Sequence, residues 1–226
     1  MDAVILAAGR GTRLKEHTDL MPKPLISVAG RPILERILES LPHGVKDIFI
    51  VTNYKEEQLQ AYCATHERGG AIHCITQGEM TGTYGALKTA APHLTSSFLV
   101  INGDDIDSTA DLERLISEPR AMGVARRKIE GYYSITTDAD GNFENMLPQT
   151  EHEKKNGALI ATGAYVLDTD FFSLPPVQMR DGEYGIPHTL RASRDIYPVL
   201  IVELPDWIQI NTPEDLVQAE ERLTAL

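Results

Sequence analysis

The stretch Ala3–Leu25, AVILAAGRGTRLKEHTDLMPKPL, decides how this chain begins to fold. Its apolar run Ala3–Leu6 stops at small residues, and a loop with two glycines and Arg13 follows. This order predicts a buried strand and then a turn whose backbone can come close to a ligand. Glycines leave amide N–H groups uncovered, so the loop can wrap anionic oxygens, while Arg13 and Lys23 add positive charge.

The glycine spacing argues against a nicotinamide-dependent oxidoreductase. Gly9 and Gly11 begin a G-x-G pattern, but Leu14 stands where the dinucleotide-binding pattern G-x-G-x-x-G has its third glycine. An ordinary strand-to-helix turn stays the alternative to a phosphate-binding loop, because short motifs of this kind are common.

The composition is that of an average soluble globular protein with a negative net charge. The chain has 226 residues, of which 42% are hydrophobic, and its 33 acidic and 21 basic residues give a net charge of −12. This length is ordinary for one α/β domain, so we expect residues 1–226 to form a single domain. The charge predicts no nucleic-acid partner, and phosphate binding would require concentrated basic groups or a divalent metal.

Cysteine usage and hydropathy predict a cytoplasmic protein. Cys63 and Cys74 form no C-x-x-C motif and no metal-ligand spacing, which indicates two ordinary reduced thiols. No signal peptide precedes the first strand, and no apolar run approaches the length that spans a membrane. We expect no membrane partner, and a homo-oligomer is compatible with the sequence.

Apolar strands and helical segments alternate along the first half of the chain. The expected strands cover 3–6, 47–52, 72–76 and 98–101. The expected helices cover 32–41, 56–66 and 83–91. This alternation is typical of an α/β fold with a doubly wound, mostly parallel sheet.

The second half is richer in strand candidates and predicts a smaller β-rich insertion. A short helix is expected at 110–116, a helical turn at 171–174, and a loop with a short helix at 178–194. The strand candidates are 123–127, 133–137, 143–146, 158–167, 199–204 and 207–210, with a hairpin turn at Asp140-Gly141. Thr212–Asp215 (TPED) has the cap, the proline and the acid of a helix start, so a last helix should follow it.

Asp104 and Asp105 follow the fourth apolar strand. Ligands of an open parallel sheet bind at the carboxyl ends of its strands, where the glycine loop also lies. A carboxylate facing such a loop is a natural Mg²⁺ ligand, because Mg²⁺ takes one or two protein carboxylates and completes its shell with water and phosphate oxygens. A solvated turn or a helix cap is the alternative for these two aspartates.

Several motifs of the chain occur together in one family. They are Leu6–Leu14, Pro22–Leu25, Pro32-Ile33, Gly82-Thr83 with Gly85–Leu87, Asn102–Asp104, Trp207 and Thr212–Leu216. With these motifs the chain resembles the sugar-1-phosphate nucleotidyltransferases, which include glucose-1-phosphate thymidylyl- and uridylyltransferases. The resemblance covers essentially the whole catalytic domain and implies a Rossmann-like fold. It also implies transfer of a nucleoside monophosphate from a nucleoside triphosphate to a sugar 1-phosphate, with release of pyrophosphate.

The resemblance implies roles for individual residues. Arg13 and Lys23 would be catalytic, with Arg13 at the leaving β- and γ-phosphates and Lys23 beside the α-phosphate. Asp104 and Asn211 would bind Mg²⁺. The triphosphate and the base would be held by Leu6, Ala7, Ala8, Gly9, Gly11, Thr12, Gln77, Gly82 and Thr83. Because the amide of Gln77 offers a donor and an acceptor to a uracil or thymine edge, UTP or dTTP is favoured over GTP.

The acceptor half departs from the family pattern. Tyr133 stands where many relatives have glycine, Ala161 where asparagine often precedes Ala-Gly, and Gln209 where aspartate is common. Gln209 is therefore the alternative to Asn211 as the second metal ligand. The candidates for acceptor binding are Gly103, Tyr133 and Gly163. Lys154 and Lys155 either contact the acceptor phosphate or belong to a solvated charged loop, which we expect.

Because of these departures, the sequence does not determine the identity of the acceptor. Besides a sugar 1-phosphate, a phosphorylated alcohol such as phosphocholine or a polyol phosphate is compatible with the sequence, with cytidylyl transfer as one form of that reaction. A non-catalytic regulatory member of the fold is a further alternative, although Arg13, Lys23 and Asp104 are all present. No left-handed β-helix repeat follows, so we expect no acetyltransferase activity.

Overall fold

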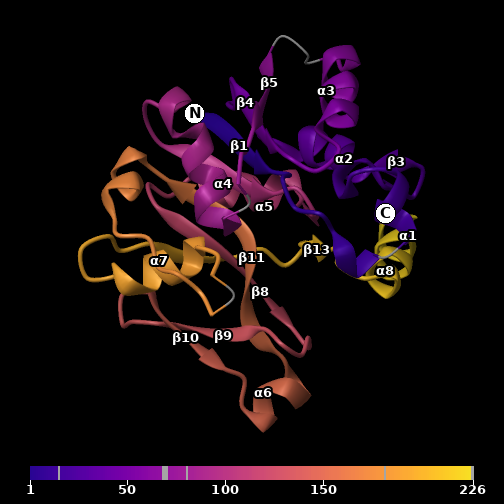
Figure 1. Ribbon diagram of the computed structural model, residues 1–226. Coiled ribbons are helices and arrows are strands. Elements are labelled where there is room, and N and C mark those ends of the chain that lie inside the picture. The colour runs from indigo at the N-terminus through magenta and orange to yellow at the C-terminus, as the bar shows by residue number, and fades with distance from the viewer. Residues whose placement is uncertain (15, 68–70, 80, 181, 225–226) are drawn as a thin grey trace.

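The fold is built on a central sheet, seen in a computed structural model that describes residues 1–14, 16–67, 71–79, 81–180 and 182–224 (Figure 1). Its seven strands lie in the order β12-β8-β11-β6-β1-β4-β5. They are β1 (Asp2–Leu6), β4 (Ile48–Thr52), β5 (Ile72–Thr76), β6 (Phe98–Asn102), β8 (Ala121–Arg127), β11 (Ala158–Leu167) and β12 (Leu200–Glu203). Only β11 runs against the others, so the sheet is mostly parallel, as predicted.

β1 lies inside the sheet because its side chains are apolar on both faces. It pairs in parallel with β4 on one side and with β6 on the other. Val4 packs into the core on one face, and Ala3 and Ile5 pack into the core on the opposite face, all three without exposed surface. A continuous apolar run is typical of a parallel strand that is covered twice.

Helices cover both faces, which confirms the doubly wound arrangement. The helices that share a core with Ile5 are α2 (Ile33–Ser40), α3 (Glu56–Thr65), α5 (Thr109–Ile116) and α8 (Pro213–Thr224). The helices that share a core with Val4 are α4 (Gly82–Ala90) and α7 (Ile186–Ala192). No helix within the described ranges is long and apolar enough to cross a membrane.

Short elements complete the framework. Two-residue strands pair as β2 (Ser27–Val28) with β3 (Arg31–Pro32) and as β7 (Asp105–Ile106) with β13 (Ile208–Gln209). The short helices and 3₁₀ turns are η1 (Thr12–Leu14), α1 (Glu16–Leu20), η2 (Lys23–Leu25), η4 (Ala91–His93) and η5 (Thr169–Ser173). Strands β9 (Tyr133–Thr137) and β10 (Phe143–Pro148) form the predicted hairpin, and its turn contains Gly141 with a φ of 85°.

The prediction of a charged loop around Lys154 and Lys155 is wrong, because a helix, α6 (Glu151–Asn156), forms there. Thr150 caps it by accepting from the Glu153 N–H, and the Glu153 carboxylate accepts from the Thr150 N–H in return. Such a capping box satisfies two helix-end donors and stabilises even a short helix. Lys154 pairs with Glu151 on this exposed helix, which forms the tip beyond the hairpin in Figure 1.

Candidate active site

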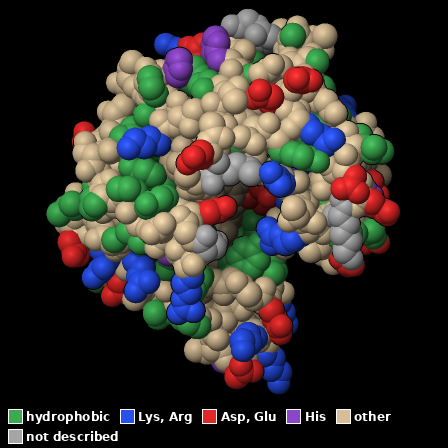
Figure 2. All heavy atoms as spheres, in the orientation of Figure 1, with side chains coloured by type: hydrophobic (Ala, Val, Ile, Leu, Met, Phe, Trp, Pro, Cys, Tyr) green, Lys and Arg blue, Asp and Glu red, His purple; other side chains and the backbone are tan. Residues whose placement is uncertain are grey.

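A cavity of about 410 Å³ opens beside the carboxyl ends of β1 and β6. Figure 2 shows this face of the molecule hollowed near its centre, with acidic and basic side chains around the hollow. The lining residues are Leu6, Ala7, Ala8, Gly9, Gly11, Thr12, Arg13, Lys23, Pro24, Gln77, Gly82, Thr83, Ala86, Asn102, Gly103, Asp104, Glu183 and Asn211. The residues predicted to be catalytic or to bind the nucleotide therefore all border one cavity, together with the predicted metal ligands Asp104 and Asn211.

The loop after β1 needs glycine at its turn. Gly11 has a φ of 63°, and a Cβ atom there would lie 3.0 Å from the Thr18 methyl group and 3.1 Å from Lys23 Cβ. Only glycine adopts this backbone conformation without strain. The Leu14 N–H donates to the Gly11 carbonyl at 2.9 Å, which starts η1 and brings Thr12 and Arg13 to the cavity.

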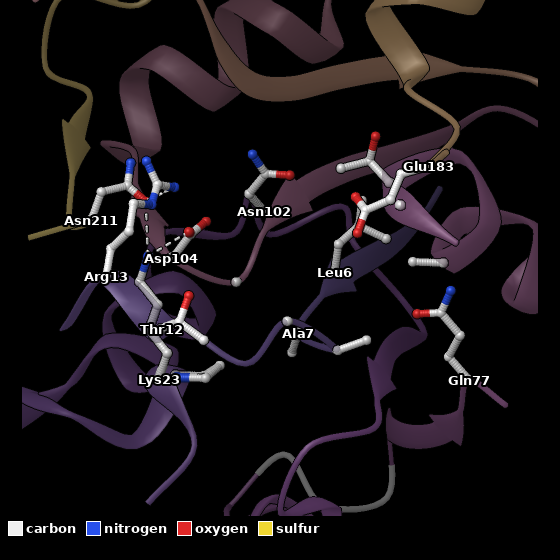
Figure 3. A pocket seen from close by; sticks show the side chains of 18 residues that line it. Leu6, Ala7, Thr12, Arg13, Lys23, Gln77, Asn102, Asp104, Glu183 and Asn211 are labelled. Carbon is white, nitrogen blue, oxygen red and sulfur yellow. Dashed lines mark hydrogen bonds and ion pairs between the residues drawn. The ribbon is translucent and has the colours of Figure 1, made fainter. Parts of the chain in front are cut away.

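Lys23 is the centre of a charged cluster at one end of the cavity. The residue is 6% exposed, and its Nζ donates to Asp104 Oδ2 at 2.6 Å and to Asn211 Oδ1 at 3.0 Å. Arg13 Nη2 donates to the same Asn211 oxygen at 2.9 Å (Figure 3). A buried ammonium is costly unless it is paired and hydrogen-bonded, and these two oxygens compensate it.

The turn after β6 directs its two aspartates differently. The Gly103 N–H donates to the Leu6 carbonyl at 2.9 Å, and a Cβ at position 103 would approach that oxygen to 2.9 Å, so glycine is needed here. Asp104 faces the cavity, whereas Asp105 is buried in β7 and accepts from Asn102 Nδ2 at 3.0 Å. Burial, and then the neighbouring Asp104, raise the pKa of Asp105 well above its usual range.

Asn211 is held in place by the N-terminal cap of α8. The Asp215 carboxylate accepts from the backbone N–H groups of Asn211 at 2.8 Å and of Thr212 at 2.9 Å. In return, Thr212 Oγ1 accepts from the Asp215 N–H at 3.2 Å. The predicted helix start is confirmed, and its reciprocal hydrogen bonds fix the backbone that presents Asn211 to the cavity.

The other end of the cavity carries an amide and an acid. Gln77 is 4% exposed, and within the described part of the chain its Nε2 has no hydrogen-bond partner. A buried donor without a hydrogen bond costs about 1–3 kcal/mol. This amide is therefore suited to bind the polar edge of a ligand. In Figure 3, Gln77 and Glu183 lie across from the charged cluster, with Leu6 and Ala7 between.

Two of the three acceptor candidates lie outside the cavity lining. Gly103 borders the cavity, but the Tyr133 side chain is 46% exposed and meets the His188 ring edge-on, with centroids 6.4 Å apart. Gly163 has a φ of 87°, and a Cβ there would collide with the Asn102 amide and lie 3.0 Å from Asp105 Oδ2. Gly163 thus leaves room for the Asn102 and Asp105 side chains at the turn after β6.

Sequence reasoning did not single out four lining residues as site residues: Pro24, Ala86, Asn102 and Glu183. Pro24, Ala86 and Asn102 stand inside motifs quoted above, and these motifs are the signal that could have identified them. Glu183 belongs to a polar segment without periodicity, and it reaches the cavity because the Tyr184 N–H donates to the Thr81 carbonyl at 2.9 Å. No local sequence pattern predicts such a contact between distant segments of the chain.

Asp104 and Asn211 suit a Mg²⁺ ion whose other coordination positions are taken by water and phosphate oxygens. The described residues contain no group of three or more His, Cys, Asp or Glu side chains that could hold a metal. Asp104 Oδ2 and Asn211 Oδ1 nevertheless converge on one cation, the Lys23 ammonium. One carboxylate and one amide oxygen suit Mg²⁺ beside phosphates. Gln209 accepts from the Tyr132 hydroxyl at 2.8 Å and does not line this cavity, which favours Asn211 as the second ligand.

Several known proteins are similar to this chain over nearly its whole length. The Bifunctional protein GlmU of Methanocaldococcus jannaschii is 37% identical over 228 residues, which cover 99% of this chain and 54% of that protein. The UTP–glucose-1-phosphate uridylyltransferase AglF of Haloferax volcanii is 30% identical, with 99% of this chain and 96% of that protein covered. The solved inositol-1-phosphate CTP transferase of T. maritima has the same fold, with a TM-score of 0.83 at 19% identity over 99% of this chain and 94% of that one.

The chain spans about half the length of the GlmU relatives that it matches. The sequence model described as "Nucleotidyl transferase" matches residues 2–225, which is almost the entire chain. With this match, and with relatives of 30% identity or more over nearly its whole length, the chain belongs to the nucleotidyl transferase family.

Proposed function

We propose that this protein transfers a nucleoside monophosphate from a nucleoside triphosphate to a sugar 1-phosphate, giving a nucleoside-diphosphate sugar and pyrophosphate. The observation that carries the proposal is the cluster of Arg13, Lys23, Asp104 and Asn211 beside the glycine loop. In-line attack on phosphorus needs alignment and charge stabilisation, and it needs no nucleophile from the protein. Two cations and an oxygen pair at one end of a cavity supply those needs.

In the proposed reaction an oxygen of the acceptor phosphate forms the new bond to the α-phosphorus. The bond from that phosphorus to the bridging oxygen breaks, and pyrophosphate leaves with the electron pair. Lys23 would offset negative charge at the α-phosphate, and Arg13 would hold the departing phosphates together with the amides of the glycine loop. Mg²⁺ held by Asp104 and Asn211 would draw the two reacting anions together.

The base is proposed to lie at the Gln77 end of the cavity. Gln77 Nε2, which has no hydrogen-bond partner among the described residues, can donate to the edge of uracil or thymine, and the amide oxygen can accept from it, so UTP or dTTP is the favoured donor. The name of the Haloferax relative, a UTP-dependent uridylyltransferase, supports the same choice.

A phosphorylated alcohol is the second candidate acceptor. The observation in its favour is Tyr133, a bulky and half-exposed ring paired with His188 where many relatives have glycine. The solved T. maritima protein of this fold is named as a CTP transferase for inositol 1-phosphate, which is a phosphorylated polyol. This candidate keeps the same phosphoryl-transfer cluster and differs in the acceptor and the base.

A pyrophosphate-release assay tests the proposal. The purified protein is given UTP, dTTP, CTP or GTP together with a hexose 1-phosphate, inositol 1-phosphate or phosphocholine, with Mg²⁺ or with a chelator. We expect Mg²⁺-dependent release with UTP or dTTP and a hexose 1-phosphate. Release only with CTP and a phosphorylated alcohol selects the second candidate. Absence of release with every pair, while Lys23→Ala and Asp104→Ala bind nucleotide like the parent, would overturn both in favour of a non-catalytic protein.

A further inference from the structure

Tyr132 makes two hydrogen bonds that connect the charged cluster to β13. Its hydroxyl donates to Gln209 Oε1 at 2.8 Å and accepts from Asn211 Nδ2 at 3.1 Å. The hydroxyl has one proton, so donating to Gln209 leaves it an acceptor for the Asn211 amide. The two hydrogen bonds therefore run in one direction: Asn211 donates to Tyr132, and Tyr132 donates to Gln209.

This direction matters because the two ends of the Asn211 amide are chemically different. With Nδ2 on Tyr132, the Oδ1 atom accepts from Lys23 at 3.0 Å and from Arg13 at 2.9 Å. The opposite orientation would place an NH₂ group against the ammonium and the guanidinium, so that donors would face donors. It would also remove the oxygen that can coordinate a metal beside Asp104.

The hydroxyl of Tyr132 stays protonated at neutral pH. Burial is the largest cause that raises its pKa to about 12. Asp105, Asp104 and Asp215 also contribute to this increase in pKa, and Arg13 opposes it.

We propose that Tyr132, itself oriented by Gln209, is a positioning residue that holds the Asn211 amide oxygen toward Lys23, Arg13 and the metal position next to Asp104. This inference rests on the proposed function, because it assigns a task within the same site. It also gives a role to Gln209, which stands where relatives commonly have aspartate. Groups around metal ligands that set their orientation typically contribute about 10–100-fold to metal affinity.

The test uses an amide-to-carboxylate comparison. Tyr132→Phe removes the hydroxyl and keeps the ring, and it is made in the parent and in an Asn211→Asp background. A carboxylate presents an oxygen in either orientation, so it does not need Tyr132 to orient it. Tyr197→Phe is the matched control, because its hydroxyl also donates once and accepts once, to Asp168 Oδ1 and from the Asp168 N–H, at 3.0 and 3.1 Å.

Mn²⁺ binding is measured by calorimetry and electron paramagnetic resonance with α,β-methylene UTP and, in parallel, α,β-methylene CTP. We expect Tyr132→Phe to weaken Mn²⁺ binding about tenfold in the parent and to change it less than twofold in the Asn211→Asp background. Tyr197→Phe should bind Mn²⁺ like the parent.

Two results would overturn the inference alone: unchanged Mn²⁺ binding by Tyr132→Phe, or an equal loss in both backgrounds, which would indicate packing instead of orientation. A parent protein that binds neither analogue with Mn²⁺ would instead overturn the proposed function and this inference with it. Urea unfolding of each variant accompanies the titrations, so that a loss of fold is recognised as such.

Discussion

Lys23 Nζ lies 2.6 Å from Asp104 Oδ2, although 81 positions separate the two residues in the chain. The Lys23 side chain is 7% exposed and that of Asp104 is 30% exposed, so the ammonium is shielded while the carboxylate borders the cavity. The pair joins the loop after β1 to the end of β6. Because charges interact strongly where water is largely excluded, each partner is sensitive to loss of the other.

Lys23→Met should abolish most of the activity. The substitution keeps most of the side-chain volume but removes the charge that we propose to lie next to the reacting phosphate, so we expect pyrophosphate release to fall about 10²–10³-fold. The assay is steady-state pyrophosphate release at saturating Mg²⁺ and nucleotide. Lys88→Met, at an exposed position of α4, is the control and should keep the parental rate. A rate within threefold of the parent for Lys23→Met would contradict the proposed role.

Gln77→Leu should reduce selectivity for the base without destabilising the protein. The variant loses the amide that would recognise the base, so kcat/KM for the preferred nucleotide should drop about 10–100-fold relative to the other nucleotides. Because the lost Nε2 has no partner within the described residues, the free energy of unfolding should stay the same or rise. Nucleotide competition and urea unfolding measure the two effects, and Gln60→Leu at an exposed position of α3 is the control. Unaltered selectivity would remove Gln77 from the base site.

Asp107 should make the protein less stable as the pH rises. The residue is 3% exposed, and neither carboxylate oxygen has a hydrogen-bond partner in the described ranges. Burial, and then Asp111, raise its pKa from 3.8 to about 7. The folded state therefore holds a proton that the unfolded state has released between these values. The contribution of this proton to the free energy of unfolding is at its maximum below about pH 4, decreases between about pH 4 and 7, and is absent at higher pH.

Asp107→Asn should cancel this dependence and stabilise the protein at pH 8 by on the order of 2–4 kcal/mol relative to the parent. Urea unfolding at pH 5, 6, 7 and 8 measures the effect, and Asp140→Asn in the exposed hairpin turn should leave the parental slope unchanged. Parallel pH profiles for the parent and Asp107→Asn would show that Asp107 is ionised in the folded state.

Gly163→Ala should destabilise the protein far more than Gly131→Ala. Both glycines have a positive φ, 87° and 84°, so each substitution carries a backbone cost of about 1–2 kcal/mol. A Cβ at Gly131 meets open space, whereas a Cβ at Gly163 collides with the Asn102 amide next to Asp105. We expect an additional loss of about 1–3 kcal/mol for Gly163→Ala, measured by urea unfolding. Equal losses in the two variants would mean that the turn after β6 can move aside.

Most of the elements could be predicted because their signals are local. The apolar run of β1, the proline at the start of α2 and the Thr212–Asp215 cap each place an element within a few residues of its observed bounds. For α6 the run of charged residues predicts a solvated loop, and the helix forms there because Thr150 and Glu153 make a capping box. The strand expected at 207–210 shrinks to Ile208–Gln209, where pairing with β7 ends.

By itself the sequence determined the loop in Ala3–Leu25, since a buried strand, a glycine with positive φ and two cations depend mainly on neighbouring residues. Only the tertiary structure decided what surrounds Lys23. Asp104 and Asn211 come from the ends of distant elements, and the orientation of Asn211 depends on Tyr132. Strand order and helix packing set these distances, and they arise from burial of the whole sheet on both faces. No short stretch of sequence contains that information.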